Sequence, residues 1–295
     1  MNTDRSAPRL LPSKAARAAV VLACAAALVF LTPFLSSTVK AQSSSSSLNP
    51  TQLEIEKERR RLASSDTEER RDAVMRLGWM ARPDASRAVL PALQDSSAIV
   101  RATAARAVLS MPADVAARSL VPLLQDREEF VRQETAYALG ESRSRLAVAP
   151  LVTALNTDKK ESVRGAAAVA LGQIGDEAAV IPLAARLSAR IRSSGLFSKI
   201  TRGQKTENEF VRRAAARSLG QIRSRAAVPA LIDALSDARA EEDVRREAAR
   251  SLGLIGDAAA VPALRTALAA RDPYLSQIAY ESLLKIAPAE ANRPL

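Results

Sequence analysis

The sequence predicts an all-α fold, an α-solenoid of about seven helical hairpins of which the last is incomplete. The first observation is a phrase of the form Val-Arg-x-x-x-Ala-x-Ala/Ser-Leu-Gly, which begins at Val131, Val163, Val211 and Val244. The second is its spacing of 31 to 33 residues, broken by one step of 48; such a period is typical of stacked supersecondary units. The third is composition: 47% apolar but only 3% aromatic residues, mostly Ala and Leu, favour packed helices over a β-core.

The first 41 residues have the pattern of a signal peptide and are not expected to belong to the fold. Basic residues precede an uninterrupted apolar run from Ala18 to Leu31, and Val39-Lys40-Ala41 supplies slim residues at the third and first positions before a cut. We therefore expect cleavage after Ala41 and export to the periplasm or cell envelope of a bacterium. The apolar run is shorter than the roughly 20 residues of a membrane span, although counting residues 33–35 leaves an uncleaved anchor as the alternative.

The composition of the remaining chain excludes several kinds of chemistry. Without residues 1–41 it has no Cys and no His, and it keeps 38 Lys and Arg against 31 Asp and Glu. An exported protein without disulfides depends on packing for its stability. The absence of His excludes His-ligated metal sites and Ser-His-Asp triads, and no pair of acids lies in a recognisable catalytic context. We expect no catalytic residue, no metal site and no cofactor.

Two short segments precede the repeats, and one follows them. Residues 42–51 are Ser-rich and are expected to form a flexible linker. Residues 52–64 predict a charged helix that caps the solenoid, with Asn49-Pro50-Thr51 as its start signal. The solenoid itself is expected over residues 66–287, and residues 288–295 are expected to form a polar tail.

Each repeat predicts a helical hairpin. Val, Ala and Leu at helical spacing form the apolar stripe of a first helix, and the small Ala side chains let neighbouring helices approach. We expect the glycine of each Leu-Gly pair to end this helix in the left-handed conformation, and the following Pro to open the second helix. An Asp or Asn before the next repeat can cap its first helix. The candidates for this cap are Asp95, Asp126, Asn156 and Asp237.

These units resemble the HEAT-repeat family, in particular the short bacterial HEAT-like repeats of the phycobilisome-lyase type. The resemblance covers about residues 66–287 and rests on the Val-Arg units, the Leu-Gly pairs and the Pro-Ala-Leu or similar motifs, such as Pro229-Ala230-Leu231. It implies an α-solenoid, a fold that serves binding proteins and a few enzymes. The end units depart from the pattern, with Glu69-Arg70 and Leu275-Ser276 in the Val-Arg position, as capping units require.

One arginine recurs at the same position of five repeats. The functional interpretation is a stripe that binds anions. The structural interpretation is that each arginine pairs with an acid of an adjacent turn or with a helix end, and the strict coincidence with the repeat favours it. The residues of this predicted structural ladder are Arg101, Arg132, Arg164, Arg212 and Arg245.

The long step indicates a basic insertion at about residues 186–206. No acid lies between Glu177 and Glu207, whereas this interval carries six cations. We expect the second helix of the fourth repeat to run to about Arg192, where Ser193-Ser194-Gly195 breaks it. The candidate binding residues of this insertion are Arg186, Arg190, Arg192, Phe197, Lys199, Arg202 and Lys205.

Several partners suit this cluster of cations beside an aromatic residue. They are an acidic protein or peptide, an anionic membrane surface, and a polyanion such as nucleic acid. Nucleic acid is the least expected, because the chain shows no aromatic interleaving for base stacking. A tolerated, solvated loop is the remaining interpretation, since a longer surface loop costs little free energy.

The leading functional hypothesis is an exported, non-enzymatic scaffold that binds a protein or peptide along the solenoid. Its oligomeric state stays open. Two alternatives are a peripheral membrane module and a HEAT-type enzyme, bilin-lyase-like or hydroxylase-like; export and the absence of His disfavour the enzyme. Second-helix side chains are expected to face the binding groove, namely Arg87, Arg118, Thr153, Asp233 and Arg265. The scattered aromatic residues Trp79, Tyr137, Tyr274 and Tyr280 are expected to pack internally.

Overall fold

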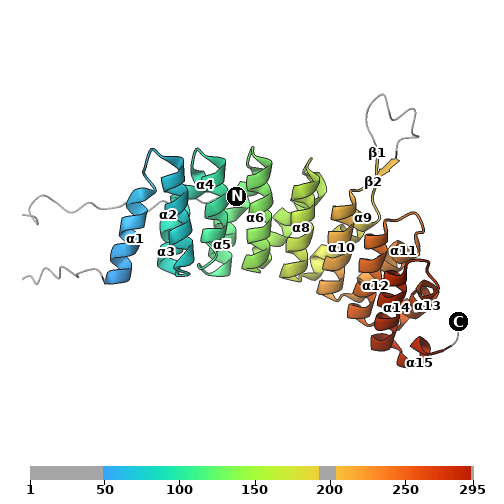
Figure 1. The fold of residues 1–295 in the computed structure, drawn as a ribbon. Coiled ribbons are helices and arrows are strands. Elements are labelled where there is room, and N and C mark those ends of the chain that lie inside the picture. The colour runs from blue at the N-terminus through green and yellow to red at the C-terminus, as the bar shows by residue number, and fades with distance from the viewer. Residues whose placement is uncertain (1–48, 193–203, 294–295) are drawn as a thin grey trace, which may run out of the picture. The chain divides into compact units, whose positions relative to one another are not determined.

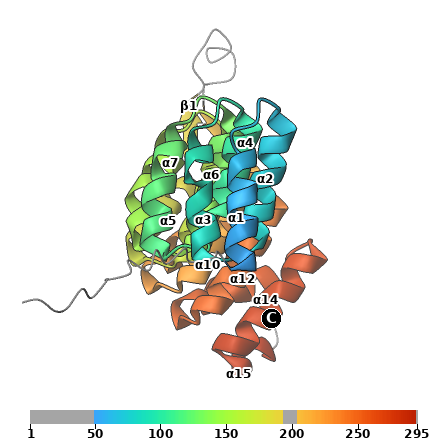
Figure 2. The same ribbon diagram turned by 90° about the vertical axis from the view of Figure 1, so that its left-hand side faces the viewer.

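The repeats form a succession of helical hairpins in two layers, as the predicted α-solenoid requires, and they run from left to right in Figure 1 (Figures 1 and 2). The computed structural model describes residues 49–192 and 204–293, which belong to one unit, Leu48–Leu295. Helix α1 (Pro50–Arg61) precedes the hairpins. The first helices, here called A helices, are α2 (Thr67–Trp79), α4 (Ala98–Ala107), α6 (Glu129–Ser142), α8 (Glu161–Ile174), α10 (Glu209–Ile222), α12 (Glu242–Ile255) and α14 (Pro273–Ile286).

The second helices, here called B helices, form the other layer. They are α3 (Pro83–Val89), α5 (Ala113–Leu120), α7 (Val148–Thr157), α9 (Val180–Leu187), α11 (Val228–Ser236), α13 (Val261–Leu268) and the short α15 (Pro288–Ala291). Short 3-10 segments flank them: η2 (Leu90–Gln94), η3 (Val121–Gln125), η4 (Arg145–Ala147), η5 (Glu177–Ala179), η7 (Arg225–Ala227) and η8 (Ala258–Ala260).

Proline opens some of the B helices but not all. In α11 and α13 it occupies the first helical turn, where its missing N–H costs no hydrogen bond, so the prediction is confirmed there. It is wrong for Pro91 and Pro122, which lie at the start of η2 and η3, after the B helix, although another proline, Pro83, opens α3 in the first repeat.

The core is the seam between the two layers. On each A helix the apolar stripe is buried, as Val131, Ala136 and Leu139 are on α6, and the B layer buries leucines such as Leu151 on α7, a helix that packs mainly against α8. The same stripe then repeats from hairpin to hairpin, so that one continuous apolar cluster runs through the described residues. Each hairpin therefore depends on its neighbours to keep its apolar face from water.

The Leu-Gly glycines are not helix caps, so that prediction is wrong. Gly140, Gly172, Gly220 and Gly253 lie inside the A helices, and a Cβ atom there would collide with the next A helix. At Gly140 it would lie 2.7 Å from the Cα atom of Ala170. The glycines are needed for this close approach of neighbouring A helices, and not for a left-handed backbone.

The left-handed cap comes three residues after the Leu-Gly glycine. It is a glycine in two repeats, Gly175 (φ 73°) and Gly256 (φ 76°), and an arginine in two others, Arg143 (φ 53°) and Arg223 (φ 58°). A residue with a Cβ atom pays a small steric cost in this conformation. Glycine therefore has two roles in these repeats, close helix packing and the left-handed cap. The glycine of the repeated Leu-Gly pair has the packing role.

The helix that precedes the insertion ends earlier than predicted. Helix α9 ends at Leu187, and Arg190–Arg192 form strand β1, which pairs antiparallel with β2 (Gln204–Thr206). The expectation of a helix to about Arg192 is therefore wrong, and the fold is all-α apart from this two-stranded ribbon. The Glu207 N–H donates to the Ala189 carbonyl (3.0 Å), so the two ends of the insertion meet before α10 begins. Residues 193–203 lie outside the described part of the chain.

The two ends of the stack differ from its middle. Helix α1 begins at a capping box in which Asn49 and Gln52 each accept from the other's backbone N–H (2.8 and 3.0 Å). At the other end, residues 288–291, expected to belong to a polar tail, form α15 against α13 and α14, with Ala291 buried. Residues 1–48, including the predicted signal peptide with its cleavage site after Ala41, lie outside the described residues.

Candidate functional site

A ladder of ion pairs joins the turns at one edge of the stack. We use the name arginine ladder for the residues at the repeated arginine position from α2 to α10. Each arginine donates from its guanidinium group to a carboxylate that lies shortly before the next A helix in the chain. The pairs are Arg70–Asp95, Arg101–Asp126, Arg132–Asp158, Arg164–Glu207 and Arg212–Glu241.

The geometry at Arg101 is representative. Its Nε and Nη2 atoms donate to the two carboxylate oxygens of Asp126 at 2.7 and 2.8 Å, and its Nη1 donates to the backbone carbonyl of Asp95 at 2.8 Å. The planar fork of arginine matches a carboxylate in this bidentate manner. One side chain of α4 therefore links the turn at Asp95 to the turn at Asp126, and little of the guanidinium group is left to bind an external anion.

The ladder lowers the pKa of its carboxylates. Hydrogen bonds from Arg70 hold the pKa of Asp95 below its ordinary value, against the opposing effect of burial. For Asp126 and Asp158, burial is the largest effect and raises the pKa, but hydrogen bonds from the ladder arginine and from a backbone N–H outweigh it, so the pKa is lowered. These carboxylates thus stay ionised in the folded protein to lower pH than in the unfolded chain.

Glu207 provides the ladder carboxylate at the insertion. Its side chain is fully buried and accepts from Arg164 Nε and Nη2 at 3.1 and 2.7 Å. Arg186 Nη1 lies 3.3 Å from the second carboxylate oxygen, and the Asn208 N–H donates to the first at 2.9 Å. Burial raises the pKa of Glu207, but these donors outweigh it and the pKa is lowered. The insertion is therefore attached to the stack through a buried carboxylate held by two arginines.

The ladder changes at its C-terminal end. Arg245 donates to the Leu235 carbonyl (3.1 Å), and the neighbouring Arg246 makes the carboxylate contact, with Asp272 at 2.8 Å. Hydrogen bonds from Arg246 lower the pKa of Asp272. The Arg246 guanidinium carbon also lies 5.2 Å from the centre of the Tyr274 ring, within the range of a cation–π contact.

The structure describes only part of the predicted binding site in the insertion. Arg186 is engaged in the stack, because it contacts Glu207 and donates to the backbone and side-chain oxygens of Asn156. Arg190, Arg192 and Lys205 have described backbones within β1 and β2, but their side chains lie outside the described part. Phe197, Lys199 and Arg202 lie outside the described residues altogether.

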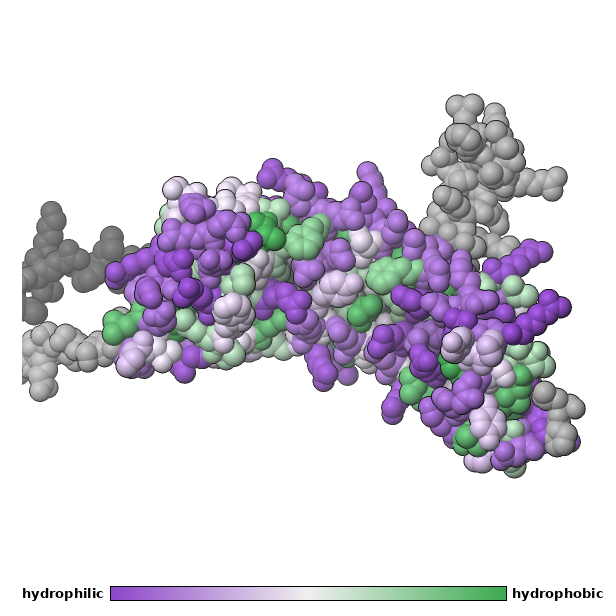
Figure 3. Space-filling view, viewed as in Figure 1, coloured by the Kyte–Doolittle hydropathy of each residue, from purple (hydrophilic) through white to green (hydrophobic). Residues whose placement is uncertain are grey.

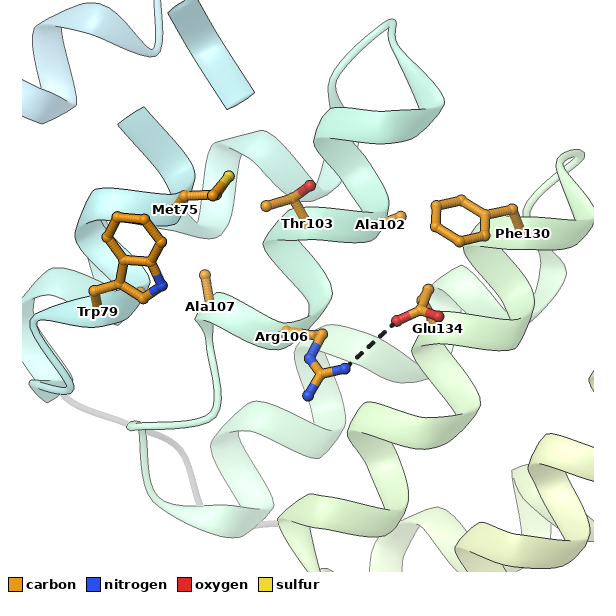
Figure 4. A pocket seen from close by; sticks show the side chains of 9 residues that line it. Met75, Trp79, Ala102, Thr103, Arg106, Ala107, Phe130 and Glu134 are labelled. Carbon is orange, nitrogen blue, oxygen red and sulfur yellow. Dashed lines mark ion pairs between the residues drawn. The ribbon is translucent and has the colours of Figure 1, made fainter. Parts of the chain in front are cut away.

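An open groove lies across the A helices near the N-terminal end of the stack. It has a volume of about 410 Å³ and follows the outer face of α4 between α2 and α6 (Figure 4). Its floor is formed by small residues of α4, including Ala102 and Ala107, together with Gly78. Met75 and Trp79 of α2 lie at one side, and Phe130 and Glu134 of α6 at the other.

The side chains of this groove are unusually exposed for apolar residues. The relative exposure is 75% for Trp79 and 47% for Phe130. Arg106 projects from α4 between the two sides, and its guanidinium group lies 3.9 Å from the Glu134 carboxylate and 3.4 Å from that of Glu141. The groove therefore combines aromatic walls, a floor without large side chains, and a small group of charges.

The expectation that the aromatic residues pack internally is wrong for two of them. Trp79 and Tyr274 are exposed, whereas Tyr137 and Tyr280 pack partly buried against the core. A sequence signal for Trp79 existed, because other repeats have Glu141, Gln173 and Gln221 at its position, and such residues mark a solvent-facing position.

The sequence analysis placed the binding groove on the B helices, whereas the groove described above lies on the A helices. Of the five B-helix residues, Arg87, Arg118, Thr153 and Asp233 are exposed, and Arg265 is partly buried and donates to the Glu290 carbonyl. The face drawn in Figure 3 is largely hydrophilic with separate hydrophobic spots, and no continuous apolar face marks a binding surface there.

The described residues contain neither a metal-binding cluster nor a membrane-spanning helix. No group of three or more His, Cys, Asp or Glu residues there could hold a metal ion. Within the same residues, none of the helices combines the length and the apolar character needed to cross a membrane.

The fold resembles those of solved repeat proteins. The Escherichia coli protein YibA matches with a TM-score of 0.53 at 20% identity, over 80% of this chain and 81% of that one. The complex of CpcE and CpcF of phycocyanin lyase from Nostoc sp. PCC7120 gives a TM-score of 0.48 at 24% identity, over 81% and 90%. Human deoxyhypusine hydroxylase in complex with glycerol gives 0.39 at 21% identity, over 79% and 96%. At these identities the likeness concerns the fold alone.

The sequence comparisons agree with the repeat architecture. No curated protein matches the chain. A family model described as HEAT repeats matches residues 59–140, 117–194 and 194–284, which together cover nearly all of the helical stack. The protein therefore belongs to the HEAT-repeat family.

Proposed function

We propose that the protein is an exported, non-enzymatic scaffold that binds a protein or peptide partner through the surface of its solenoid, with the basic insertion as a second contact. The observation that carries the proposal is the open groove over α4, with Trp79 and Phe130 exposed at its sides. Exposed aromatic residues around a concave surface are typical of protein-binding sites, because burying them on association is favourable.

The arginine ladder supports this interpretation because its own side chains are already engaged, which leaves other surfaces for a partner. Its arginines are engaged with carboxylates and carbonyl groups inside the stack, so an anionic substrate would have to break those contacts. The binding surfaces that remain are the helix faces and the insertion. A row of hairpins offers such faces repeatedly, which suits an extended partner.

Export follows from the pattern of the first 41 residues, and it has its own test. The protein is isolated from cells that make it, and the N-terminal residue of the product is determined. We expect Gln42 as the first residue and recovery from the cell envelope fraction. A product that begins at Met1 in the cytosolic fraction would exclude export.

Binding is tested by cross-linking in the same cells. The wild-type protein is compared with a variant in which Arg190, Arg192, Lys199, Arg202 and Lys205 are changed to Ser. Arg186 is kept, because it contacts the buried Glu207 and its loss would perturb the stack.

The comparison of wild type and variant distinguishes binding through the solenoid surface from binding through the insertion. We expect the wild type to recover a specific protein, and the variant to recover it less well if the insertion takes part. Equal recovery would remove the insertion from the proposal, and no specific partner for either protein would contradict the scaffold function.

A further inference from the structure

We propose that two copies of the protein form a dimer in which the A–B edge of one copy lies antiparallel against that of the other. The A–B edge is the row of turns that join each A helix to its own B helix, and its hairpins are numbered 1 to 6 from α2 and α3 to α12 and α13. Strands β1 and β2 lie at the opposite edge, because they join a B helix to the next A helix (Figure 1). This surface is separate from the groove over α4 and from the insertion, so the proposal is independent of the scaffold function.

The charge of the A–B edge alternates along the stack. The turns of hairpins 3 and 5 are residues 143–145 and 223–225, and both have the sequence Arg-Ser-Arg. The turns of hairpins 2, 4 and 6 carry acids instead. Neighbouring hairpins are separated by roughly 10 Å, the usual distance between packed helices, and the sign of the charge changes at each such step. The acidic residues are Asp114, Asp176, Glu177 and Asp257.

Two of the arginines in these turns are not used by the fold. Arg143 and Arg223 are exposed, and their side chains form no ion pair or hydrogen bond with the described residues. Both are the left-handed caps of their A helices, at a position that Gly175 and Gly256 hold in hairpins 4 and 6. Arginine pays a steric cost there that glycine avoids. A residue that is kept in such a conformation without an internal partner is a candidate for an external contact.

The other charges of the edge are only partly engaged within the chain. Two ion pairs run along the edge at 3.4 and 3.5 Å, and their arginine side chains are 85% and 86% exposed: Arg145–Asp176 and Arg225–Asp257. Glu177 accepts one hydrogen bond, from Ser224 Oγ at 2.8 Å. Exposed ion pairs of this kind contribute little to stability, and their donors and acceptors remain accessible to a partner.

A second copy of the chain is the partner that this alternation fits. A twofold axis between hairpins 3 and 4, perpendicular to the stack, reverses the order of the turns in the other copy. The basic turn of hairpin 3 then faces the acidic turn of hairpin 4 of the partner subunit, and the basic turn of hairpin 5 faces Asp114 of the partner subunit. Each facing pair joins opposite charges, as a self-complementary interface requires. A polyanion or an anionic membrane would meet acidic turns as often as basic ones.

Two exposed apolar side chains select the position of the axis. Leu146 follows the basic turn of hairpin 3 and is 47% exposed, and Ile181 lies at the start of α9 in hairpin 4 and is 80% exposed. The axis between hairpins 3 and 4 places Leu146 beside Ile181 of the partner subunit, twice in the dimer, so that the two side chains shield each other from water. An axis between hairpins 4 and 5 also pairs opposite charges, but Ala226 would then stand in the place of Leu146.

The test measures dimerisation by sedimentation equilibrium of the purified protein. A reducing agent is present, so that Cys24, the only cysteine of the chain, cannot link two copies. We expect a dimer at low salt and a rise of its dissociation constant as added salt screens the facing charges. A monomer at every protein and salt concentration would overturn the proposal.

Charge reversal shows whether the A–B edge forms the interface. Arg143→Glu and Glu177→Arg each place like charges opposite one another, so we expect each variant alone to dimerise at least about tenfold more weakly than the wild type. Mixed in equal amounts, the two variants should dimerise like the wild type, because every facing pair of the mixed dimer joins opposite charges again. Neither residue has an ion-pair partner in the described part of the chain, and circular dichroism checks that each variant is folded.

Arg217→Glu and Glu209→Arg are the matched controls, because they reverse exposed charges within α10 and not in a turn of the A–B edge. Both should dimerise like the wild type. A mixture of Arg143→Glu and Glu177→Arg that stays monomeric would contradict the interface, and so would control variants that weaken the dimer as much.

The apolar contact has its own variants. Leu146→Ser and Ile181→Ser should weaken the dimer to a similar extent, because each removes one side of the same contact. An effect of Ile181→Ser alone would contradict the axis between hairpins 3 and 4. A monomer that binds vesicles of anionic lipid, and loses this binding in Arg143→Glu, would overturn the dimer and assign the edge to a membrane instead.

Discussion

Glu207→Gln should destabilise the protein far more than its position at the end of a long insertion suggests. The substitution keeps the size of the side chain and removes its charge. One oxygen can still accept from Arg164 Nη2 and the Asn208 N–H, but the second oxygen becomes an amide that faces Arg164 Nε and Arg186 Nη1 at 3.1 and 3.3 Å. Two guanidinium groups then lose their counter-charge in a buried site.

The magnitude follows from these contacts. A hydrogen bond to a charged group contributes about 1.5–3 kcal/mol, and removing one member of a buried ion pair costs about 3–5 kcal/mol. Because the side chains of Arg164 and Arg186 are themselves 10% and 20% exposed, water recovers part of this loss. We expect the free energy of unfolding to fall by roughly 2–4 kcal/mol.

The assay is urea denaturation followed by circular dichroism, with Glu209→Gln as the control. Glu209 is exposed in the first turn of α10, two residues from the site, and its substitution should change the free energy of unfolding by less than about 0.5 kcal/mol. A double variant, Arg164→Met with Glu207→Met, should recover part of the loss, because it leaves fewer buried charges unpaired. Equal denaturation midpoints for the two Gln variants would refute the reasoning.

Three further predictions concern the stack. Acidification should destabilise the stack below about pH 4, because the pKa values of the ladder carboxylates are lower in the folded than in the unfolded protein and the unfolded chain therefore takes up protons first. Urea denaturation midpoints between pH 7 and pH 3 measure this effect, and midpoints that rise on acidification would contradict it. Gly140→Ala should lower the free energy of unfolding by about 1–3 kcal/mol, since its Cβ atom meets the backbone of Ala170 at 2.7 Å; an unchanged midpoint would show that the A helices can separate freely. Trp79→Ala should change thermal stability little because the side chain is 75% exposed, and calorimetry that finds a large loss would show that Trp79 packs internally after all.

The repeat architecture was predictable because it follows from spacing alone. A regular Val-Arg period, Ala and Leu at helical intervals, and end units that depart from the pattern together specify which helices stack and in what order. The same information led to the wrong role for the Leu-Gly glycines, since a glycine near a helix end suits both a left-handed cap and a close helix contact. The distance between Gly140 and the neighbouring helix decides it.

The candidate groove was harder to predict for a related reason. Ala102 and Thr103 look like ordinary packing residues in a sequence rich in alanine, and only the neighbouring helices reveal that they form the floor of a trough. A hydrophobic period says which face of a helix is buried, but not how far the other face is recessed between its neighbours. Likewise, the basic composition of the insertion did not show that Arg186 turns inward to a buried carboxylate.

The closed base of the insertion has a consequence for engineering this protein. Because the Glu207 N–H meets the Ala189 carbonyl and Glu207 completes the ladder, the chain leaves the stack and returns to it at almost the same point. Because β1 and β2 pair with each other here, a change in the number of residues that join them should leave the register of α9 and α10 unaltered. The segment between the two strands is therefore a natural place to graft a reporter or an epitope, provided that Glu207 is left in place.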